Sequence, residues 1–81
     1  MRIRLILFAL YRDITGVDQL DLDVQEGSSA AAALGRLRAA DPRFRALPER
    51  PVVAVNREYA LLDVQLRDGD ELALLPPVAG G

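Results

Sequence analysis

The chain has 81 residues, enough for one domain that can bury roughly 60–65% of its unfolded surface. It is 51% hydrophobic and carries a net charge of −2, and its arginines are scattered rather than gathered in the basic stripe that nucleic-acid binding requires. Cysteine and histidine are both absent, which removes disulfides and the commonest nucleophile, general-base and metal-ligand chemistries. The composition therefore argues against a self-contained enzyme and favours a cytoplasmic protein.

The first ten residues are expected to form a strand. The apolar run from Leu5 to Leu10 behind Arg2 and Arg4 is too short for the hydrophobic region of a signal peptide, and no small-residue cleavage site follows it cleanly. Leu10 to Thr15 is expected to make a short helical turn, which Gly16 ends. No stretch approaches the length needed to span a membrane, so no membrane partner is expected.

A second strand follows, with one face turned to solvent. The run from Leu20 to Val24 alternates apolar residues with Asp21 and Asp23, which is typical of a strand whose apolar side chains share one face. The two acids could act as paired catalytic carboxylates. A solvated strand face is the simpler interpretation, and it is the one we expect.

The main helix is expected to begin after Gly27 and to run to about Ala40. Ser28 or Ser29 is a suitable N-cap, because its hydroxyl can accept a hydrogen bond from an unpaired backbone N–H. Asp41-Pro42 ends the helix, since the residue before a proline disfavours the α conformation. The expected apolar stripe consists of Ala30, Ala33, Leu34 and Leu37, and the arginines expected to face outward are Arg36 and Arg38.

Three further strands are expected, and the middle one is short. Val52 to Val55 is a β-branched run without polar alternation, as in an inner strand, and Tyr59 to Leu62 is a short edge segment. The turn Asp68-Gly69-Asp70 leads into the last strand, Glu71 to Leu75. This turn and the nearby Asp63 lack the twelve-residue ligand spacing of a calcium loop, so no metal site is expected.

This order of elements predicts an α+β domain over residues 1–75, in which one main helix packs on one face of a mixed sheet. The helix leaves the other face open. Four apolar residues of the first and last strands point to that open face: Ile6, Phe8, Ala73 and Leu75. We expect Phe8, Tyr59 and Leu75 to contact a partner protein there, with Arg12 at the rim. The alternative is an incidental face, since scattered exposed apolar residues are normal.

Residues 76–81 are expected to leave the domain as an extended tail. Pro76 and Pro77 lack backbone N–H groups and cannot continue a central strand. The residues beyond them are small or compact: Val78, Ala79, Gly80 and Gly81. Such a tip could thread a narrow channel and present its α-carboxylate as the reacting group. The alternative is a frayed end without a function.

Several of these motifs together resemble a known family. They are Phe8-Ala9 with Arg12 shortly after, Ala54-Val55-Asn56, Asp68-Gly69-Asp70-Glu71 and Pro76-Pro77-Val78-Ala79-Gly80-Gly81, so the similarity spans nearly the whole chain. The sequence resembles the ubiquitin-like β-grasp sulfur carriers, which include the small subunit of molybdopterin synthase and the thiamine-pathway carrier. The Asp-Gly-Asp turn and the Gly-Gly end are shared across these carriers, whereas Pro-Pro-Val favours the molybdopterin branch.

The resemblance implies a ubiquitin-like β-grasp fold and a carrier function without a bound cofactor. An adenylating enzyme of the ubiquitin-activating type would use ATP to adenylate the Gly81 carboxylate, and a sulfur donor protein would convert the acyl adenylate to a thiocarboxylate. The tail would then enter a pocket of the large subunit of molybdopterin synthase. There it would deliver sulfur to cyclic pyranopterin monophosphate, a step of molybdenum cofactor biosynthesis.

The sequence is also compatible with other functions. They are a sulfur carrier for thiamine synthesis or tRNA thiolation, a ubiquitin-like modifier of proteins, and a β-grasp interaction module with an inert tail. Deleting Gly81, or adding one residue after it, should abolish the activity of a carrier and leave the binding of an adaptor intact.

All ten basic residues are arginine, and none is lysine. This indicates compositional bias or heat adaptation. The alternative is that the absence of lysine protects an activated C-terminus from attack by amine side chains.

Overall fold

The computed structural model describes residues 1–76, and the predictions for Pro77, Val78, Ala79, Gly80 and Gly81 lie outside them. The elements are, in chain order, β1 (Arg2–Leu7), α1 (Ala9–Thr15), β2 (Gln19–Asp23), α2 (Ala30–Ala40), the 3₁₀ helix η1 (Pro42–Ala46), β3 (Val52–Val55), β4 (Glu58–Ala60) and β5 (Glu71–Leu75). Every strand that the sequence predicts is present, and so is the main helix. No helix of the described part of the chain is long and apolar enough to cross a membrane.

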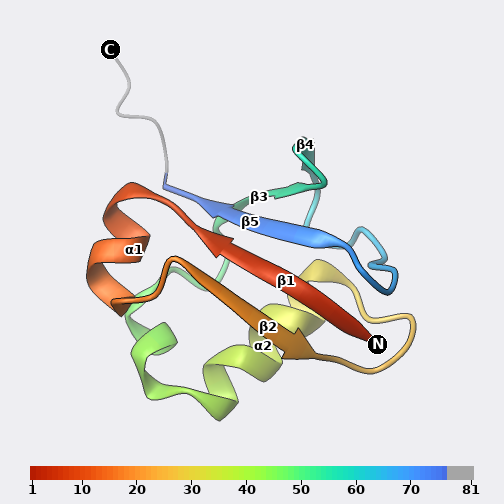
Figure 1. Cartoon of the computed structure of the whole chain (residues 1–81), viewed down its shortest axis with the longest axis horizontal. Coiled ribbons are helices and arrows are strands. Elements are labelled where there is room, and N and C mark those ends of the chain that lie inside the picture. The colour runs from red at the N-terminus through yellow and green to blue at the C-terminus, as the bar shows by residue number, and fades with distance from the viewer. Residues whose placement is uncertain (77–81) are drawn as a thin grey trace.

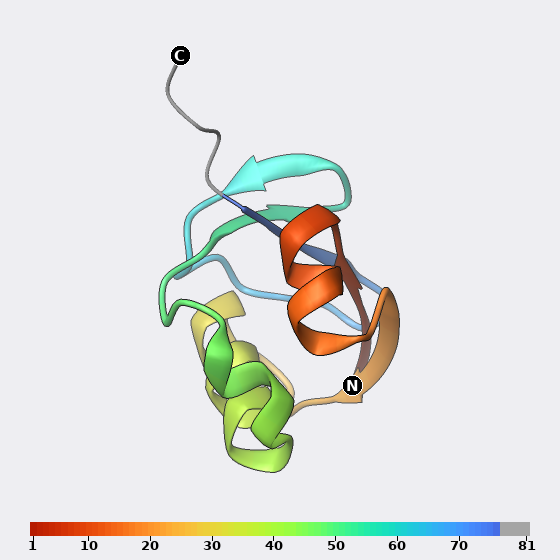
Figure 2. The same ribbon diagram turned by 90° about the vertical axis from the view of Figure 1, so that its left-hand side faces the viewer.

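The five strands form one mixed sheet in the order β2-β1-β5-β3-β4. The first and last strands pair in parallel at its centre, with Arg4 opposite Glu71 and Leu7 opposite Leu74. All other neighbours are antiparallel. Figure 1 shows α1 at the end of the sheet where β1 finishes, and Figure 2 shows the strands curving around α2 and η1. The expected α+β arrangement, with one main helix on one face of a mixed sheet, is confirmed.

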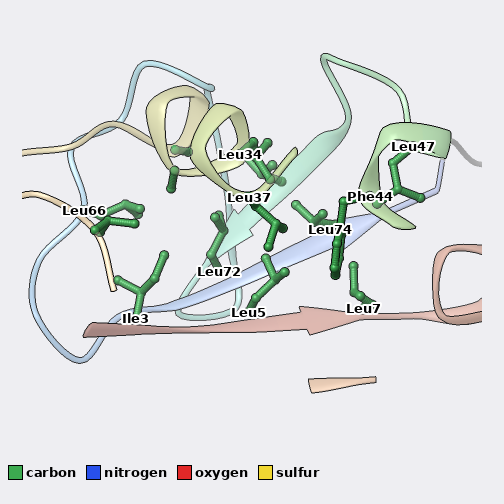
Figure 3. Close-up of a cluster of buried hydrophobic side chains, with 14 of the residues drawn as sticks. Ile3, Leu5, Leu7, Leu34, Leu37, Phe44, Leu47, Leu66, Leu72 and Leu74 are labelled. Carbon is green, nitrogen blue, oxygen red and sulfur yellow. The ribbon is translucent and has the colours of Figure 1, made fainter. Parts of the chain in front are cut away.

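The core lies between α2 and the central strands. Leu34 and Leu37 of α2 point toward the β1 and β5 side chains, as Figure 3 shows. The strand residues on this face alternate with outward ones and are almost fully buried: Ile3, Leu5, Leu7, Leu72 and Leu74. Phe44 and Leu47 close the core from the η1 segment. Burial of each such side chain stabilises the fold by about 1.5–3 kcal/mol, so this layer is the main source of stability.

The ends of α2 follow from its flanking residues. The hydroxyl of Ser29 accepts a hydrogen bond from the Ala32 N–H at 3.1 Å, which makes Ser29 the N-cap. Asp41 ends the helix, and its carboxylate then caps η1 by accepting the Arg43 N–H at 3.0 Å. One residue of α2 differs from expectation: Arg38 is half-buried, and its guanidinium donates to the carbonyls of Phe44 and Leu47 at the end of η1.

The first strand is shorter than the sequence predicts. It ends at Leu7 because the chain turns at Ala9, whose φ of 45° lies in the left-handed region. Phe8 therefore follows β1 and serves as the N-cap residue of α1. The helix ends as expected at Gly16, which has a φ of 75°. The edge strand β4 also differs slightly, since Glu58–Ala60 replaces the expected Tyr59–Leu62.

The Asp-Gly-Asp turn before β5 is held by hydrogen bonds from three parts of the chain. Asp68 accepts the Arg2 N–H at 2.8 Å, and Asp70 accepts the Arg67 N–H at 2.7 Å. The Asn56 side chain donates to Asp70 at 3.0 Å and accepts the Glu71 N–H at 3.0 Å. The turn between β3 and β4 is thus tied to the start of β5.

Truncation of a core leucine should be costly. Leu72→Ala is expected to lower the free energy of unfolding by about 2–5 kcal/mol, because it leaves a cavity under α2. The matched variant Leu61→Ala truncates a side chain that is 76% exposed. This variant should change the free energy of unfolding by less than about 0.5 kcal/mol. Urea titration of both variants measures the difference. Equal effects would contradict the assignment of the core.

Replacement of Asn56 should loosen the tie between the two turns. Asn56→Ala removes both side-chain hydrogen bonds and places alanine at a φ of 50°, so we expect a loss of about 1–2 kcal/mol in the free energy of unfolding. Asn56→Gly removes the same bonds but accepts this φ, and should lose less. Thermal unfolding of the two variants separates these contributions. An alanine variant as stable as the parent would contradict this account.

Candidate functional site

The face of the sheet opposite α2 is uncovered, and the strand register decides which residues share it. Ile6 pairs with Ala73, Ala73 pairs with Ala54, and Ala54 pairs with Tyr59. Residues paired across neighbouring strands point to the same side, so these four form one row on the open face. Leu75 and its partner Val52 form the next row toward the end of β5.

These rows border a hollow of about 550 Å³. Its lining residues are Ile6, Phe8, Ala54, Arg57, Tyr59, Glu71, Ala73 and Leu75, and we call this surface the apolar hollow. Phe8 is 45% exposed and Tyr59 is 78% exposed, so both have large apolar areas in contact with solvent. A hollow with an apolar floor and exposed aromatic residues is suited to bind a protein surface.

The structure brings together three of the four residues that the sequence proposed for a partner surface. Phe8, Tyr59 and Leu75 all line the apolar hollow, although they are far apart in the chain. Arg12 is not among the lining residues and lies exposed on α1. Whether any of these residues contacts a partner stays a prediction.

Three lining residues were missed from the sequence: Ala54, Arg57 and Glu71. Ala54 lies in a run of apolar residues without alternation, so its face could not be assigned. Arg57 lies in the turn between β3 and β4, where side-chain direction depends on backbone angles that the sequence pattern does not give. Glu71 begins β5, and the alternation Glu71, Ala73, Leu75 was the signal that could have placed it on this face.

Phe8 is held in place by α1. The Phe8 carbonyl accepts the Tyr11 N–H at 3.0 Å, and the Tyr11 side chain is buried in the core. At the other end of α1, the buried Thr15 hydroxyl donates to the Tyr11 carbonyl at 2.9 Å. The helix is thus anchored by its inner face and presents Phe8 to the apolar hollow.

The tail begins at Pro76, which we call the tail root, and it lies at the edge of the apolar hollow. Because β1 and β5 run in parallel, the end of β5 lies beside the end of β1, where Phe8 follows. β5 ends at Leu75, and Pro76 lies outside the strand, as expected for a residue without an N–H. Anything bound in the apolar hollow is therefore adjacent to the start of the tail.

The other half of the open face is charged. Arg2 and Asp23 form an ion pair at 3.1 Å, and Arg4 and Asp21 form one at 3.7 Å. The hydrogen bond and positive charge of Arg2 lower the pKa of the Asp23 carboxyl. Asp21 and Asp23 are exposed and paired with arginines, which confirms the solvated strand face. Exposed pairs of this kind add little stability.

Two kinds of reactive site are absent from the described part of the chain. Across residues 1–76 there is no group of three or more acidic side chains placed to hold a metal ion. Asp68 and Asp70 instead accept hydrogen bonds from backbone and side-chain groups of the turn. The lining of the apolar hollow contains no nucleophile paired with a base.

Comparison with known proteins agrees with this arrangement. A molybdopterin synthase sulfur carrier subunit from Arabidopsis thaliana is 35% identical over 81 residues, which cover 100% of this chain and 84% of that protein. The crystal structure of SAMP1 from Haloferax volcanii matches with a TM-score of 0.84 and 31% identity, covering 100% of both chains. The ubiquitin-like β-grasp fold is thereby confirmed.

A second solved structure shares the fold at lower identity. It is a complex of subunits 1 and 2 of the molybdopterin-converting factor from Helicobacter pylori, in which the matching chain has a TM-score of 0.70 and 21% identity, with 100% of both chains covered. The family model described as the ThiS family matches residues 5–81. The chain therefore belongs to the ThiS family, within the ubiquitin-like sulfur carriers that include the small subunit of molybdopterin synthase.

Proposed function

We propose that the chain is the sulfur carrier subunit of a molybdopterin synthase. The observation that carries this proposal is the position of the tail root beside an exposed apolar hollow, in a chain that matches a molybdopterin synthase sulfur carrier subunit over its whole length. A carrier needs a surface that its partners hold and a reactive group that they do not cover. The apolar hollow and the C-terminal carboxylate are suited to these two tasks.

The chemistry follows from the weak electrophilicity of a carboxylate. A carboxylate oxygen of Gly81 attacks the α-phosphorus of ATP on an activating enzyme and displaces pyrophosphate, which gives an acyl adenylate. A hydrosulfide ion delivered by a donor protein then adds to the acyl carbon and displaces AMP, which leaves a thiocarboxylate. In the synthase, the thiocarboxylate sulfur bonds to cyclic pyranopterin monophosphate, and water cleaves the bond between the acyl carbon and sulfur, which restores the Gly81 carboxylate.

The large subunit of the synthase is the partner that we place on the apolar hollow. In the Helicobacter pylori structure, a chain with this fold is in a complex with subunit 2 of the molybdopterin-converting factor. A subunit seated on Phe8, Tyr59 and Leu75 would start its contact directly at Pro76. The small residues that follow could then enter its active site without a side-chain clash.

A second candidate function is that of a protein modifier. It is favoured by the match to SAMP1, whose full name in a related structure is small archaeal modifier protein 1. A modifier would transfer the activated Gly81 carbonyl to an amine on another protein instead of accepting sulfur. The two functions share the adenylation step and differ in the acceptor, so the product of the activated tail distinguishes them. A carrier for thiamine synthesis or tRNA thiolation differs only in the final sulfur acceptor.

Removal of a lining side chain should weaken the complex without unfolding the carrier. Phe8→Ala is expected to reduce binding of the large subunit by about 2 kcal/mol or more, because truncation of a buried aromatic anchor commonly has an effect of that size, and Leu75→Ala should also weaken binding. The matched control is Ile14→Ala, which truncates a side chain that is 43% exposed and lies outside the apolar hollow.

Isothermal titration and thermal unfolding measure the two effects. Near-parental melting temperatures together with lost affinity for Phe8→Ala and Leu75→Ala, but not for Ile14→Ala, are the expected result. Unfolded variants whose folded fraction still binds normally would assign these residues to the core instead.

The tail should acquire sulfur at its last residue. After incubation with the activating enzyme, ATP and a sulfur donor from the same source, mass spectrometry of the terminal peptide should show one oxygen replaced by sulfur. Gly81→Val should reduce the rate about a hundredfold, because a displacement of about 1 Å at the reacting group has an effect of that size. Val78→Ala, in the same tail, should retain most of the activity. An unmodified parent tail, with partner binding intact, would favour an adaptor with an inert end.

A further inference from the structure

The turn between β3 and β4 holds two residues in an unusual conformation. Asn56 and Arg57 have φ values of 50° and 72°, as the two central residues of a type I′ turn do. Asparagine tolerates this region, and glycine is the usual second residue. In this region the Cβ of an arginine comes close to the following carbonyl oxygen, which strains the backbone. Glycine has no Cβ and would adopt the conformation of Arg57 more easily.

The Arg57 side chain has a defined place on the open face. It lines the apolar hollow together with Glu71, at the start of β5, whereas Phe8 and Leu75 lie toward the tail root. Within residues 1–76, neither an ion pair nor a side-chain hydrogen bond engages its guanidinium. A strained backbone that presents an exposed cation beside a binding surface points to a function for that cation.

We propose that Arg57 is a recognition residue, which pairs with a carboxylate of the large synthase subunit when that subunit covers the apolar hollow. This inference rests on the proposed function and adds a specificity contact to it. The guanidinium can bind a carboxylate with two parallel hydrogen bonds, which fixes the direction of approach. Glu71 lies at the same end of the hollow and would repel a carboxylate placed away from Arg57.

Such a contact would set the orientation of the partner. The apolar floor of the hollow attracts a hydrophobic surface but does not define how that surface is rotated. Leu75 at the tail root and Glu71 at the other end of β5 are four residues apart, on the order of 13 Å in a strand. A charge pair at the Arg57 end, with the tail at the other, gives the partner two separated points of attachment. Charged contacts of this kind contribute mainly to the rate and register of association.

Substitutions at Arg57 separate charge from backbone strain. Arg57→Gln removes the charge, Arg57→Lys keeps it without the planar fork, and Arg57→Gly removes both the charge and the strain. The matched control is Arg67→Gln, which makes the same change in net charge at an exposed residue that does not line the apolar hollow. Association and dissociation rates with the purified large subunit are measured at low and at physiological salt, and melting temperatures are measured on the isolated chain.

We expect Arg57→Gln to raise the Kd by about threefold to tenfold, mainly through slower association, with a smaller difference at high salt. Arg57→Lys should lie between this variant and the parent, and Arg67→Gln should match the parent. Arg57→Gly should bind as weakly as Arg57→Gln although its melting temperature rises by about 3–6 °C. If Arg57 had a purely structural role, Arg57→Gly would not raise the melting temperature and weaken binding of the large subunit at the same time.

Equal affinities of the parent, Arg57→Gln and Arg57→Gly for the large subunit would overturn the inference and leave the proposed function intact. An equal loss in Arg67→Gln would also overturn it, because the effect would then come from net charge alone. A parent chain that does not bind the large subunit would contradict the proposed function itself, and this inference with it.

Discussion

The parallel pairing of β1 with β5 determines the rest of the structure. It joins the first and last strands at the centre of the sheet, with Leu5 opposite Leu72 and Leu7 opposite Leu74. These four leucines are almost fully buried, so the strand that leads into the tail is among the best-anchored parts of the domain. The same pairing brings the end of β5 beside Phe8. In the proposed function, a tail that other proteins take up is therefore attached to a well-buried strand at the edge of the surface that they would hold.

The open face of the sheet combines two surfaces with different properties. The half near the tail root is apolar and hollowed, whereas the half near the Asp-Gly-Asp turn carries arginine–aspartate pairs. Paired charges keep the exposed strand β2 hydrated and discourage association through the wrong end of the sheet. The apolar half remains exposed next to Pro76, so in the proposed function a partner bound there would lie beside the start of the tail.

Much of the fold could be predicted from local sequence signals. Alternation along the run Leu20–Val24, the cap Ser29 and the breaker Asp41-Pro42 each depend on residues close together in the chain, and each led to the observed element. The left-handed turn at Ala9 could not be predicted, because alanine carries no preference for positive φ and tertiary packing of α1 imposes it. Because this turn was not foreseen, β1 was expected to extend beyond Leu7.

The site was predicted in part. Phe8, Tyr59 and Leu75 were found because apolar residues on the uncovered face of a sheet need an explanation, and the structure gathers them around one hollow. Arg57 was missed because the sequence pattern predicts neither its positive φ nor the place of its side chain in the lining of the apolar hollow. Arg12 was expected at the rim; it lies exposed on α1 outside the lining residues, and its contact with a partner stays a prediction. The chemistry of the tail depends on residues beyond Pro76 and was inferred from their composition and from the family.

The most direct test of the central claim is a single-turnover transfer experiment. The chain carrying a thiocarboxylate at Gly81 is mixed with the large synthase subunit and cyclic pyranopterin monophosphate, and sulfur is followed by mass spectrometry in both the terminal peptide and the pterin product. A sulfur carrier of molybdopterin synthase should lose one sulfur from its tail for each sulfur that the pterin gains. Retention of the thiocarboxylate in the presence of a bound large subunit, or its transfer to an amine of another protein, would contradict the account.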